Sequence, residues 1–283
     1  MKPTCHPLAG HSGVLATKHK KTSLIAPAMR EIIGMNVRCV EVDTDQLGTF
    51  GGQIARTGTP LQTAIAKAKL GIKESGERLG FASEGSISAD SLMPLVADYE
   101  IVVFVNSIEG YEVSESVRSF DIIVRSTSAQ QIEELETFLT SADFPHHGLI
   151  VRPADNSYDV IYKGIHDYDT LKSALKHVSR ISQDSRAIVE TDLRAHHCPS
   201  RQRNIEAAAV KLAERLKELC PACRTPGWGV VRVNHGLPCD WCGMKTSLIC
   251  EKVFGCAVCD REDVRNSDNG ETADPQWCER CNP

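Results

Sequence analysis

The sequence lacks the features that would assign it to a membrane, secreted or polyanion-binding class. No apolar stretch is long enough to span a bilayer, and no continuous apolar segment follows the basic residues near the start. The formal net charge of −5 gives no general attraction to nucleic acid or anionic surfaces. These absences predict a cytoplasmic globular protein of 283 residues, with one substantial domain and a smaller appended one.

Cysteine, in contrast, is abundant and concentrated. Eight of the twelve cysteines form four Cys-x-x-Cys pairs in the last part of the chain: Cys220/Cys223, Cys239/Cys242, Cys256/Cys259 and Cys278/Cys281. Eight thiolates make two tetrahedral sites, and the 15, 13 and 18 residues between successive pairs are typical of zinc ribbons. The sequence therefore predicts two structural zinc ions in a double zinc-ribbon module over residues 220–283.

Three other roles for these cysteines agree less well with the sequence than structural zinc sites do. A disulfide framework needs an oxidising compartment, which the absence of a secretory signal disfavours. A thioredoxin-like redox role suits one Cys-x-x-Cys pair rather than four in series. A catalytic zinc needs an open coordination position, which four complete pairs do not leave.

The spacing does not decide which pairs share a metal ion. A sequential arrangement joins the first pair with the second and the third with the fourth, and it is slightly favoured. A nested arrangement joins the second pair with the third, because Cys239–Cys259 alone has the pattern of a compact ribbon. The outer pairs would then form the other site.

The charge of the cysteine-rich segment bears on its partners. Residues 220–283 hold seven Lys and Arg against nine Asp and Glu, a net charge of −2 before the thiolates are counted. Counterion release from phosphates needs a basic surface, so nucleic acid is an unlikely partner. Trp228, Trp241 and Trp277 have the composition to stack on bases, but we expect them to pack around the metal sites. The segment is predicted to be a structural cap or a protein-docking surface.

Residues 12–197 alternate short apolar strands with amphipathic helices. The pattern predicts strands near 14–17, 37–42, 79–82, 101–106, 121–124, 147–151, 159–162 and 187–191, and helices over 24–33, 59–73, 129–139 and 168–178. This order predicts an α/β domain with a mixed, largely parallel sheet and helices on both faces. An amphipathic helix within residues 198–219 is expected to connect this domain to the cysteine-rich module.

Three polar clusters follow predicted strands, where ligands bind in such sheets. Thr17–Lys21 combines lysines with the start of a helix and suits a phosphate group. Ser83–Ser86 places Glu84 in a turn beside glycine and serine, which suits Mg²⁺ or the activation of water. Glu190–Arg203 holds acids, histidines and arginines at high density.

Part of this pattern resembles a known superfamily. Thr59–Lys69 (TPLQTAIAKAK), a short gap and Gly80–Ile87 (GFASEGSI) look like the core of the inosine/xanthosine triphosphate pyrophosphatases. In these enzymes a helix with alanine and a basic residue precedes a strand that ends in an acidic motif. With the cysteine-rich tail, the whole chain resembles an uncharacterised bacterial family in which such a domain precedes a zinc-ribbon tail.

The resemblance implies roles for individual residues. Glu84 matches the acidic residue that handles Mg²⁺ and the attacking water, Lys18 or Lys21 the lysine of the first loop, and Lys67 the basic residue of the helix. Arg201 lies at the arginine-rich helix start near which the superfamily contacts the purine. From the dense cluster Glu190–Arg203 we further expect Asp192 or Glu190 to help Glu84 to hold Mg²⁺, and Arg194 and His196 to bind the nucleotide. Two positions depart from the pattern: Gln62 replaces a glutamate that helps to hold the metal, and the first loop reads Thr-Lys-His-Lys-Lys.

These observations give two functional hypotheses. The first is a Mg²⁺-dependent nucleoside triphosphate pyrophosphatase acting on a nucleotide, including a non-canonical purine nucleotide. The second is a non-catalytic nucleotide-binding adaptor or sensor that docks a protein partner through its zinc module. If the first holds, Glu84 and at least one of Asp192, Arg194, His196 or Arg201 are expected to line one cleft, with Lys18 or Lys21 at its rim.

Overall fold

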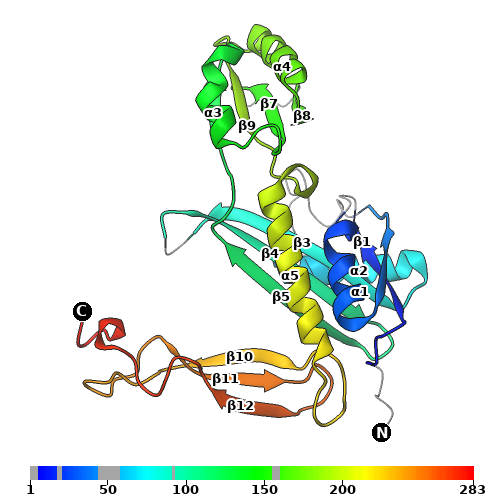
Figure 1. Ribbon diagram of the computed structural model, residues 1–283, viewed down its shortest axis with the longest axis vertical. Helices are drawn as coiled ribbons and strands as arrows, with labels where there is room; N and C mark the ends of the chain where they lie inside the picture. Colours follow the sequence, from blue (N-terminus) through cyan, green and yellow to red (C-terminus); the bar gives the residue numbers. More distant parts are fainter. Residues whose placement is uncertain (1–5, 18–20, 44–57, 91–92, 155–159) are drawn as a thin grey trace.

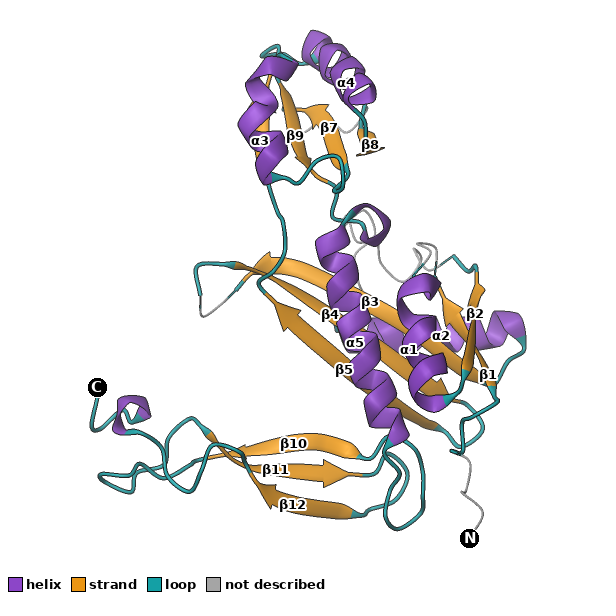
Figure 2. Cartoon of the chain, viewed as in Figure 1, coloured by secondary structure: helices purple, strands orange, loops and turns teal. Residues whose placement is uncertain are grey.

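The computed structural model describes residues 6–17, 21–43, 58–90, 93–154 and 160–283, and it has a mixed α/β fold in three parts (Figure 1). A central unit contains a five-stranded sheet, a small unit contains a four-stranded sheet, and the C-terminal module contains a three-stranded sheet (Figure 2). Among the described residues, no helix is both long and apolar enough to cross a membrane. Lys18 lies outside the described residues.

The central sheet has the strand order β2-β1-β3-β4-β5. β1 is parallel to β2 and β3, whereas β3, β4 and β5 are antiparallel neighbours. The sheet is therefore mixed but not largely parallel, because β3, β4 and β5 follow one another through short reversals of the chain. Its strands are β1 (Ser12–Ala16), β2 (Asn36–Val40), β3 (Leu79–Ala89), β4 (Val96–Asn106) and β5 (Tyr111–Ser119).

Helices cover both faces of this sheet, as the sequence predicts. α1 (Thr22–Ile33) and α5 (Pro199–Lys217) pack side by side on one face, where Phe81 and Phe104 are fully buried. α2 (Pro60–Ser75) packs on the other face through Ala64 and Ala68. Since neighbouring residues of a strand point to opposite faces, each residue of β3 and β4 is assigned to one of these two layers.

β3 is much longer than the predicted strand 79–82. It continues through Ala89 because β4 pairs with it along its whole length, from Leu79↔Asn106 to Ala89↔Val96. Ser83–Ser86 therefore lies inside a strand and not in a turn. The glycine and serines in this segment carry weak strand signals, and the antiparallel partner overrides them.

The strands predicted for the second half of the α/β domain form a separate, antiparallel sheet. Its order is β6-β9-β7-β8, and it packs against α3 and α4. The segment 121–124, predicted as a strand, is extended chain without strand pairing. The elements of this unit are β6 (Ser126–Ala129), η2 (Ile132–Leu135), α3 (Glu136–Ser141), β7 (Leu149–Pro153), β8 (Tyr162–Ile165), α4 (Tyr168–Ile181) and β9 (Ala187–Thr191).

α5 connects the three parts. A short 3-10 helix, η3 (Ala195–His197), leads from the small unit into α5, which crosses the central sheet and ends beside the C-terminal module (Figure 1). Its apolar stripe, which includes Ile205, Leu212 and Leu216, is fully buried against the central unit. The C-terminal module consists of β10 (Gly229–His235), β11 (Ile249–Gly255), β12 (Glu262–Asn266) and the 3-10 helix η4 (Pro275–Trp277).

Candidate functional site

The eight paired cysteines form two clusters in the C-terminal module. In each cluster, the four sulfur atoms lie within 4.8 Å of one another. The first cluster contains Cys220, Cys223, Cys256 and Cys259, and the second contains Cys239, Cys242, Cys278 and Cys281. Both clusters could bind a metal ion such as zinc.

The clusters interleave along the chain. The first pair joins the third and the second joins the fourth, so that neither the sequential nor the nested arrangement is correct. The antiparallel sheet explains this pairing, because Gly229 at the start of β10 lies opposite Gly255 at the end of β11. The pair that precedes β10 and the pair that follows β11 therefore meet at one end of the sheet. The remaining two pairs meet at the other end, where Cys239 bridges Ala273.

The sulfur geometry suits a tetrahedral metal ion. The Sγ–Sγ distances are 3.7 Å for Cys220–Cys259 and 3.5 Å for Cys223–Cys256. They are 3.9 Å for Cys239–Cys281 and 3.6 Å for Cys242–Cys278. A tetrahedron of Zn–S bonds of about 2.3 Å has edges of about 3.8 Å. Cys250 is not a ninth ligand, since its thiol donates to the carbonyl oxygen of Asn234 at 3.2 Å.

A second group of interest is a set of buried charged side chains in the central unit, which we call the ionic cluster. Lys67 Nζ donates to Glu84 Oε2 at 2.5 Å, and Lys21 Nζ donates to Ser83 Oγ at 2.9 Å. Asn204 Nδ2 donates to Asp98 Oδ2 at 2.7 Å, and Arg201 Nε pairs with Glu100. The ionic cluster consists of Lys21, Lys67, Glu84, Asp98, Glu100, Arg201 and Asn204.

The ionic cluster spans both faces of the sheet. Glu84 pairs across the ladder with Ile101 and points to the α2 face, where Lys67 meets it. Asp98 and Glu100 point to the other face, where α5 supplies Arg201 and Asn204. β1 pairs with β3 only at Val14↔Gly80 and Leu15↔Phe81, which leaves the rest of that edge open to Lys21.

Lys21 connects the two faces electrostatically. Burial lowers the pKa of Lys21 to about 8, and the charges of Glu100, Arg201, Glu84 and Lys67 all act on it. Glu84, Lys67 and Arg201, which the sequence singled out, therefore act electrostatically on Lys21. Because Glu84 points to the α2 face and Arg201 lies on the α5 face, the expectation that they line one cleft is not confirmed. Whether they perform the predicted roles stays a prediction.

Two members of the cluster, Asp98 and Glu100, were not expected from the sequence. Both are fully buried, and within the described part of the chain no donor group hydrogen-bonds Asp98 Oδ1 or Glu100 Oε2, although the two carboxyl groups lie within hydrogen-bond reach of each other. Burial, followed by the charge of Glu100, raises the pKa of Asp98 to about 6. The sequence does carry a signal, because acids at positions 98 and 100 share one face of a strand whose next residues are apolar (IVVFV).

Gly85 makes room for the ion pair between β4 and α5. It lies directly opposite Glu100, and a Cβ atom on Gly85 would lie 2.3 Å from Arg201 Nη2 and 2.5 Å from both carboxylate oxygens of Glu100. Only a residue without a side chain allows the charged pair to lie this close to β3.

The other predicted site residues precede α5, where Arg201 Nη1 of the ionic cluster donates to Leu193 O at 2.8 Å. Asp192 is fully buried, and its carboxylate accepts hydrogen bonds from Arg194 (Nη2 at 2.5 Å) and from the backbone N–H of Gly164 at 3.0 Å. His196 is exposed and stacks on His197, with ring centroids 4.0 Å apart. β9, which leads into Asp192, belongs to the small sheet and not to the sheet of β3, so the expected shared edge does not exist.

A hydrogen-bonded relay joins the small unit to the start of α5. His147 Nδ1 lies 3.0 Å from Asp143 Oδ2, and His147 Nε2 lies 3.0 Å from Ser200 Oγ and accepts the backbone N–H of Ser200 at 3.2 Å. Nδ1 therefore carries the proton, and burial lowers the pKa of His147. His147 and Ser200 are buried and Asp143 is exposed, so the relay runs from the surface of the small unit to the start of α5.

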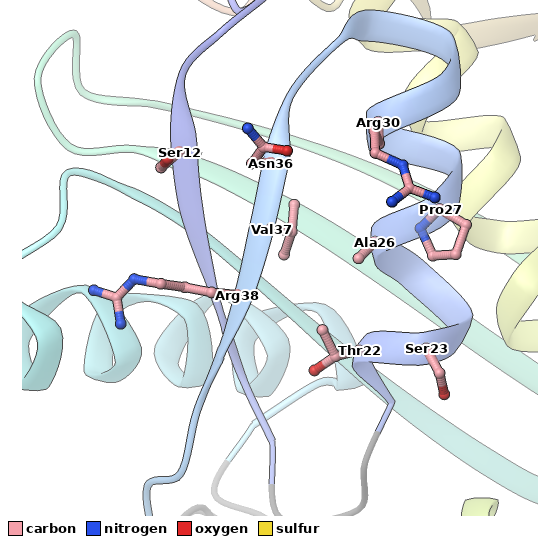
Figure 3. Close-up of a pocket in the computed structure, with 9 residues that line it drawn as sticks. All are labelled: Ser12, Thr22, Ser23, Ala26, Pro27, Arg30, Asn36, Val37 and Arg38. Carbon is pink, nitrogen blue, oxygen red and sulfur yellow. The ribbon is translucent and has the colours of Figure 1, made fainter.

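A cavity of about 460 Å³ lies between α1 and the β1–β2 edge (Figure 3). Thr22 and Ser23, at the start of α1, line one end of it, while Arg30 and Arg38 supply positive charge. Arg38 also pairs with Glu77 at 3.1 Å. None of the site residues predicted from the sequence lines this cavity, although Thr22 follows Lys21 directly.

Replacement of Gly85 by alanine is expected to destabilise the central unit. The added methyl group displaces Arg201 from Glu100, and breaking a buried ion pair costs about 3–5 kcal/mol. Urea unfolding measures the decrease in the free energy of unfolding. The control is Ser88→Ala, at an exposed position of the same strand, which is expected to change this free energy by no more than about 0.5 kcal/mol. Without a clash, alanine would instead stabilise the strand by about 0.4–1 kcal/mol, and that result would refute the predicted packing.

Paired cysteine substitutions test the interleaved clusters. Two zinc ions per chain are expected in the purified protein. Cys220→Ser combined with Cys256→Ser removes ligands of one cluster only and is expected to retain about one zinc per chain. Cys220→Ser combined with Cys239→Ser damages both clusters and is expected to retain none. The zinc content of the two double variants is measured by mass spectrometry. If Cys220→Ser with Cys239→Ser retained one zinc and Cys220→Ser with Cys256→Ser retained none, the interleaved arrangement would be contradicted.

Comparison with known proteins identifies a family. No curated protein matches the chain. A family model described as a domain of unknown function (DUF6671) matches residues 67–283. The match takes in both cysteine clusters and most of the ionic cluster, from Lys67 to Asn204, and it covers more than half of the chain. The chain therefore belongs to the DUF6671 family.

Proposed function

We propose that the ionic cluster binds the phosphate groups of a nucleotide together with Mg²⁺, and that the protein hydrolyses a nucleoside triphosphate to a monophosphate and pyrophosphate. The observation that carries this proposal is the pair of fully buried carboxylates, Asp98 and Glu100, each with one oxygen atom that lacks a hydrogen-bond donor within the described residues. Three cationic side chains, Lys21, Lys67 and Arg201, lie in the same electrostatic group.

The donor set fits a magnesium ion. Mg²⁺ prefers carboxylate oxygens and retains water molecules, and the unpartnered oxygens of Asp98 and Glu100 offer two such ligands. A divalent cation would relieve the repulsion between two adjacent buried carboxylates, which helps to raise the pKa of Asp98. When bound, the ion supplies charge neutralisation at the phosphate oxygens.

The side chains of the cluster have distinct tasks in this reaction. Lys21, Lys67 and Arg201 offer N–H donors to the charge that develops on the phosphate oxygens. Glu84 accepts the proton of the attacking water, whose oxygen forms a bond to the α-phosphorus while the bond to the pyrophosphate breaks.

Two contacts favour a second candidate, the non-catalytic nucleotide-binding adaptor. Gln62 replaces the expected metal-binding glutamate, and its side chain completes a capping box at the start of α2, with Oε1 2.9 Å from Thr59 N. Glu84 is held by Lys67 at 2.5 Å. Both contacts support a site that binds nucleotide without turning it over.

Turnover measurements separate the two candidates. The protein is incubated with nucleoside triphosphates and Mg²⁺, and the released pyrophosphate is converted to phosphate and quantified. Glu84→Gln is expected to lower turnover by about 10²–10⁴-fold, as loss of a proton acceptor does. Asp98→Asn is also expected to lower turnover, because it removes a ligand of the metal ion. Glu112→Gln, at a surface ion pair with Lys69, is the matched control and is expected to keep full activity. Nucleotide-induced thermal stabilisation without turnover would favour the adaptor. The absence of both turnover and stabilisation would refute both candidate functions.

The stability of Asp98→Asn provides a test that does not depend on activity. The folded pKa of Asp98, about 6, lies above the ordinary value of 3.8, so the folded state binds more protons between these pH values. The wild type therefore loses folding stability as the pH rises through 6 and the buried carboxyl ionises. The asparagine variant has no such loss, because its side chain cannot ionise. We expect the variant to melt at a higher temperature than the wild type at pH 7.5 and at a similar temperature at pH 4. Mg²⁺ is expected to stabilise the wild type at pH 7.5 but not the variant, and equal stabilisation of both would remove Asp98 from the metal site.

A further inference from the structure

Two of the three tryptophans are exposed at one end of the C-terminal module. Trp241 is 77% exposed and Trp277 is 55% exposed, whereas Trp228 is buried. The expectation that all three pack around the metal sites therefore does not hold for Trp241 and Trp277. An exposed indole ring is a large apolar surface, and two in one small module mark a binding surface.

Both exposed tryptophans belong to the second cysteine cluster. Trp241 precedes Cys242 and Trp277 precedes Cys278, and the sulfur atoms of these two cysteines are 3.6 Å apart. The two chain segments are joined further by Asp240 N, which donates to Ala273 O at 3.0 Å, and by Thr272 Oγ1, which donates to Asp240 Oδ1 at 3.1 Å. A metal ion bound by the four cysteines would hold both segments in place.

The position of this surface leaves it accessible. The short helix that contains Trp277 lies beside the C-terminus, at the end of the module that points away from α5 and from the small unit (Figure 1). Neither tryptophan is part of the ionic cluster. The surface is therefore independent of the proposed nucleotide site.

The surroundings of the two rings are acidic. Four exposed acids lie in the same two segments, with only two exposed basic residues, Lys245 and Arg280. Among the described residues, none of these acids forms an ion pair. A metal ion with four thiolates adds further negative charge, about −2 for zinc. The acids are Asp240, Glu271, Asp274 and Glu279.

We propose that Trp241, Trp277 and these acids bind an arginine- or lysine-rich peptide segment of a partner protein. The face of an indole ring attracts a guanidinium or ammonium group, and the carboxylates attract the same groups over a longer range. A nucleic acid strand would also stack on tryptophan, but it would meet repulsion from the acids. The charge of the surface therefore selects a basic peptide over a nucleic acid.

Binding of an acetylated hexa-arginine peptide tests this surface. The peptide is expected to quench the tryptophan fluorescence of the full-length protein, and the binding is expected to weaken as the salt concentration rises. The double variant Trp241→Ala, Trp277→Ala is expected to bind about tenfold more weakly, which calorimetry measures. Metal analysis establishes that the variant retains both metal ions, since neither tryptophan is a ligand.

Two controls keep the result specific. Val264→Ala, at an exposed position on β12 of the same module, is expected to bind the peptide like the wild type. A hexa-glutamate peptide is expected not to bind. Equal affinity of the double tryptophan variant and the wild type for hexa-arginine would overturn the proposal. Tighter binding of a single-stranded oligonucleotide than of the peptide, lost in the same variant, would also overturn it.

Discussion

The arrangement of the whole chain depends on how the start of α5 is fixed to the central sheet. Arg201 pairs with Glu100 in a buried position, and Asn204 donates to Asp98 one turn later. Burying charges is costly, and such a pair does not by itself imply high stability. It does specify one docking position, because any shift of α5 would leave two carboxylates and an arginine buried without partners. The same helix end meets the small unit through His147 and Ser200. One helix terminus thus fixes two units relative to each other.

The opposite end of α5 is fixed to the C-terminal module. Arg215 Nε donates to Gly227 O at 3.2 Å, and Cys220, three residues after the helix, belongs to the first cysteine cluster. Because the clusters interleave, each one joins chain segments on both sides of a ligand pair of the other. Each metal ion would therefore join β10 and β11 at its own end of the sheet, and its binding is expected to be coupled to the folding of that end.

The sequence allowed much of the local structure to be predicted, for reasons that specific residues illustrate. Gly34 ends α1 in a left-handed conformation and Thr59 caps α2, and both signals are local. The eight cysteines of the two clusters could be named because Cys-x-x-Cys is a short-range pattern. What could not be predicted was pairing between distant segments. The extension of β3 depends on β4, the division into two sheets depends on which strands meet, and the interleaved cysteines depend on the register of β10 and β11.

The same distinction explains which members of the ionic cluster were identified from the sequence. Lys21, Lys67, Glu84 and Arg201 lie next to recognisable motifs, whereas Asp98 and Glu100 occur in a strand that the apolar run 101–105 dominates. Gly85 gave no separate signal, yet its missing side chain is what lets Glu100 and Arg201 lie against β3. Asp98 and Glu100 each keep one partner on α5 and one oxygen without a donor among the described residues. Their paired oxygens fix the position of α5, whereas the other two oxygens add a desolvation cost that an apolar residue would avoid.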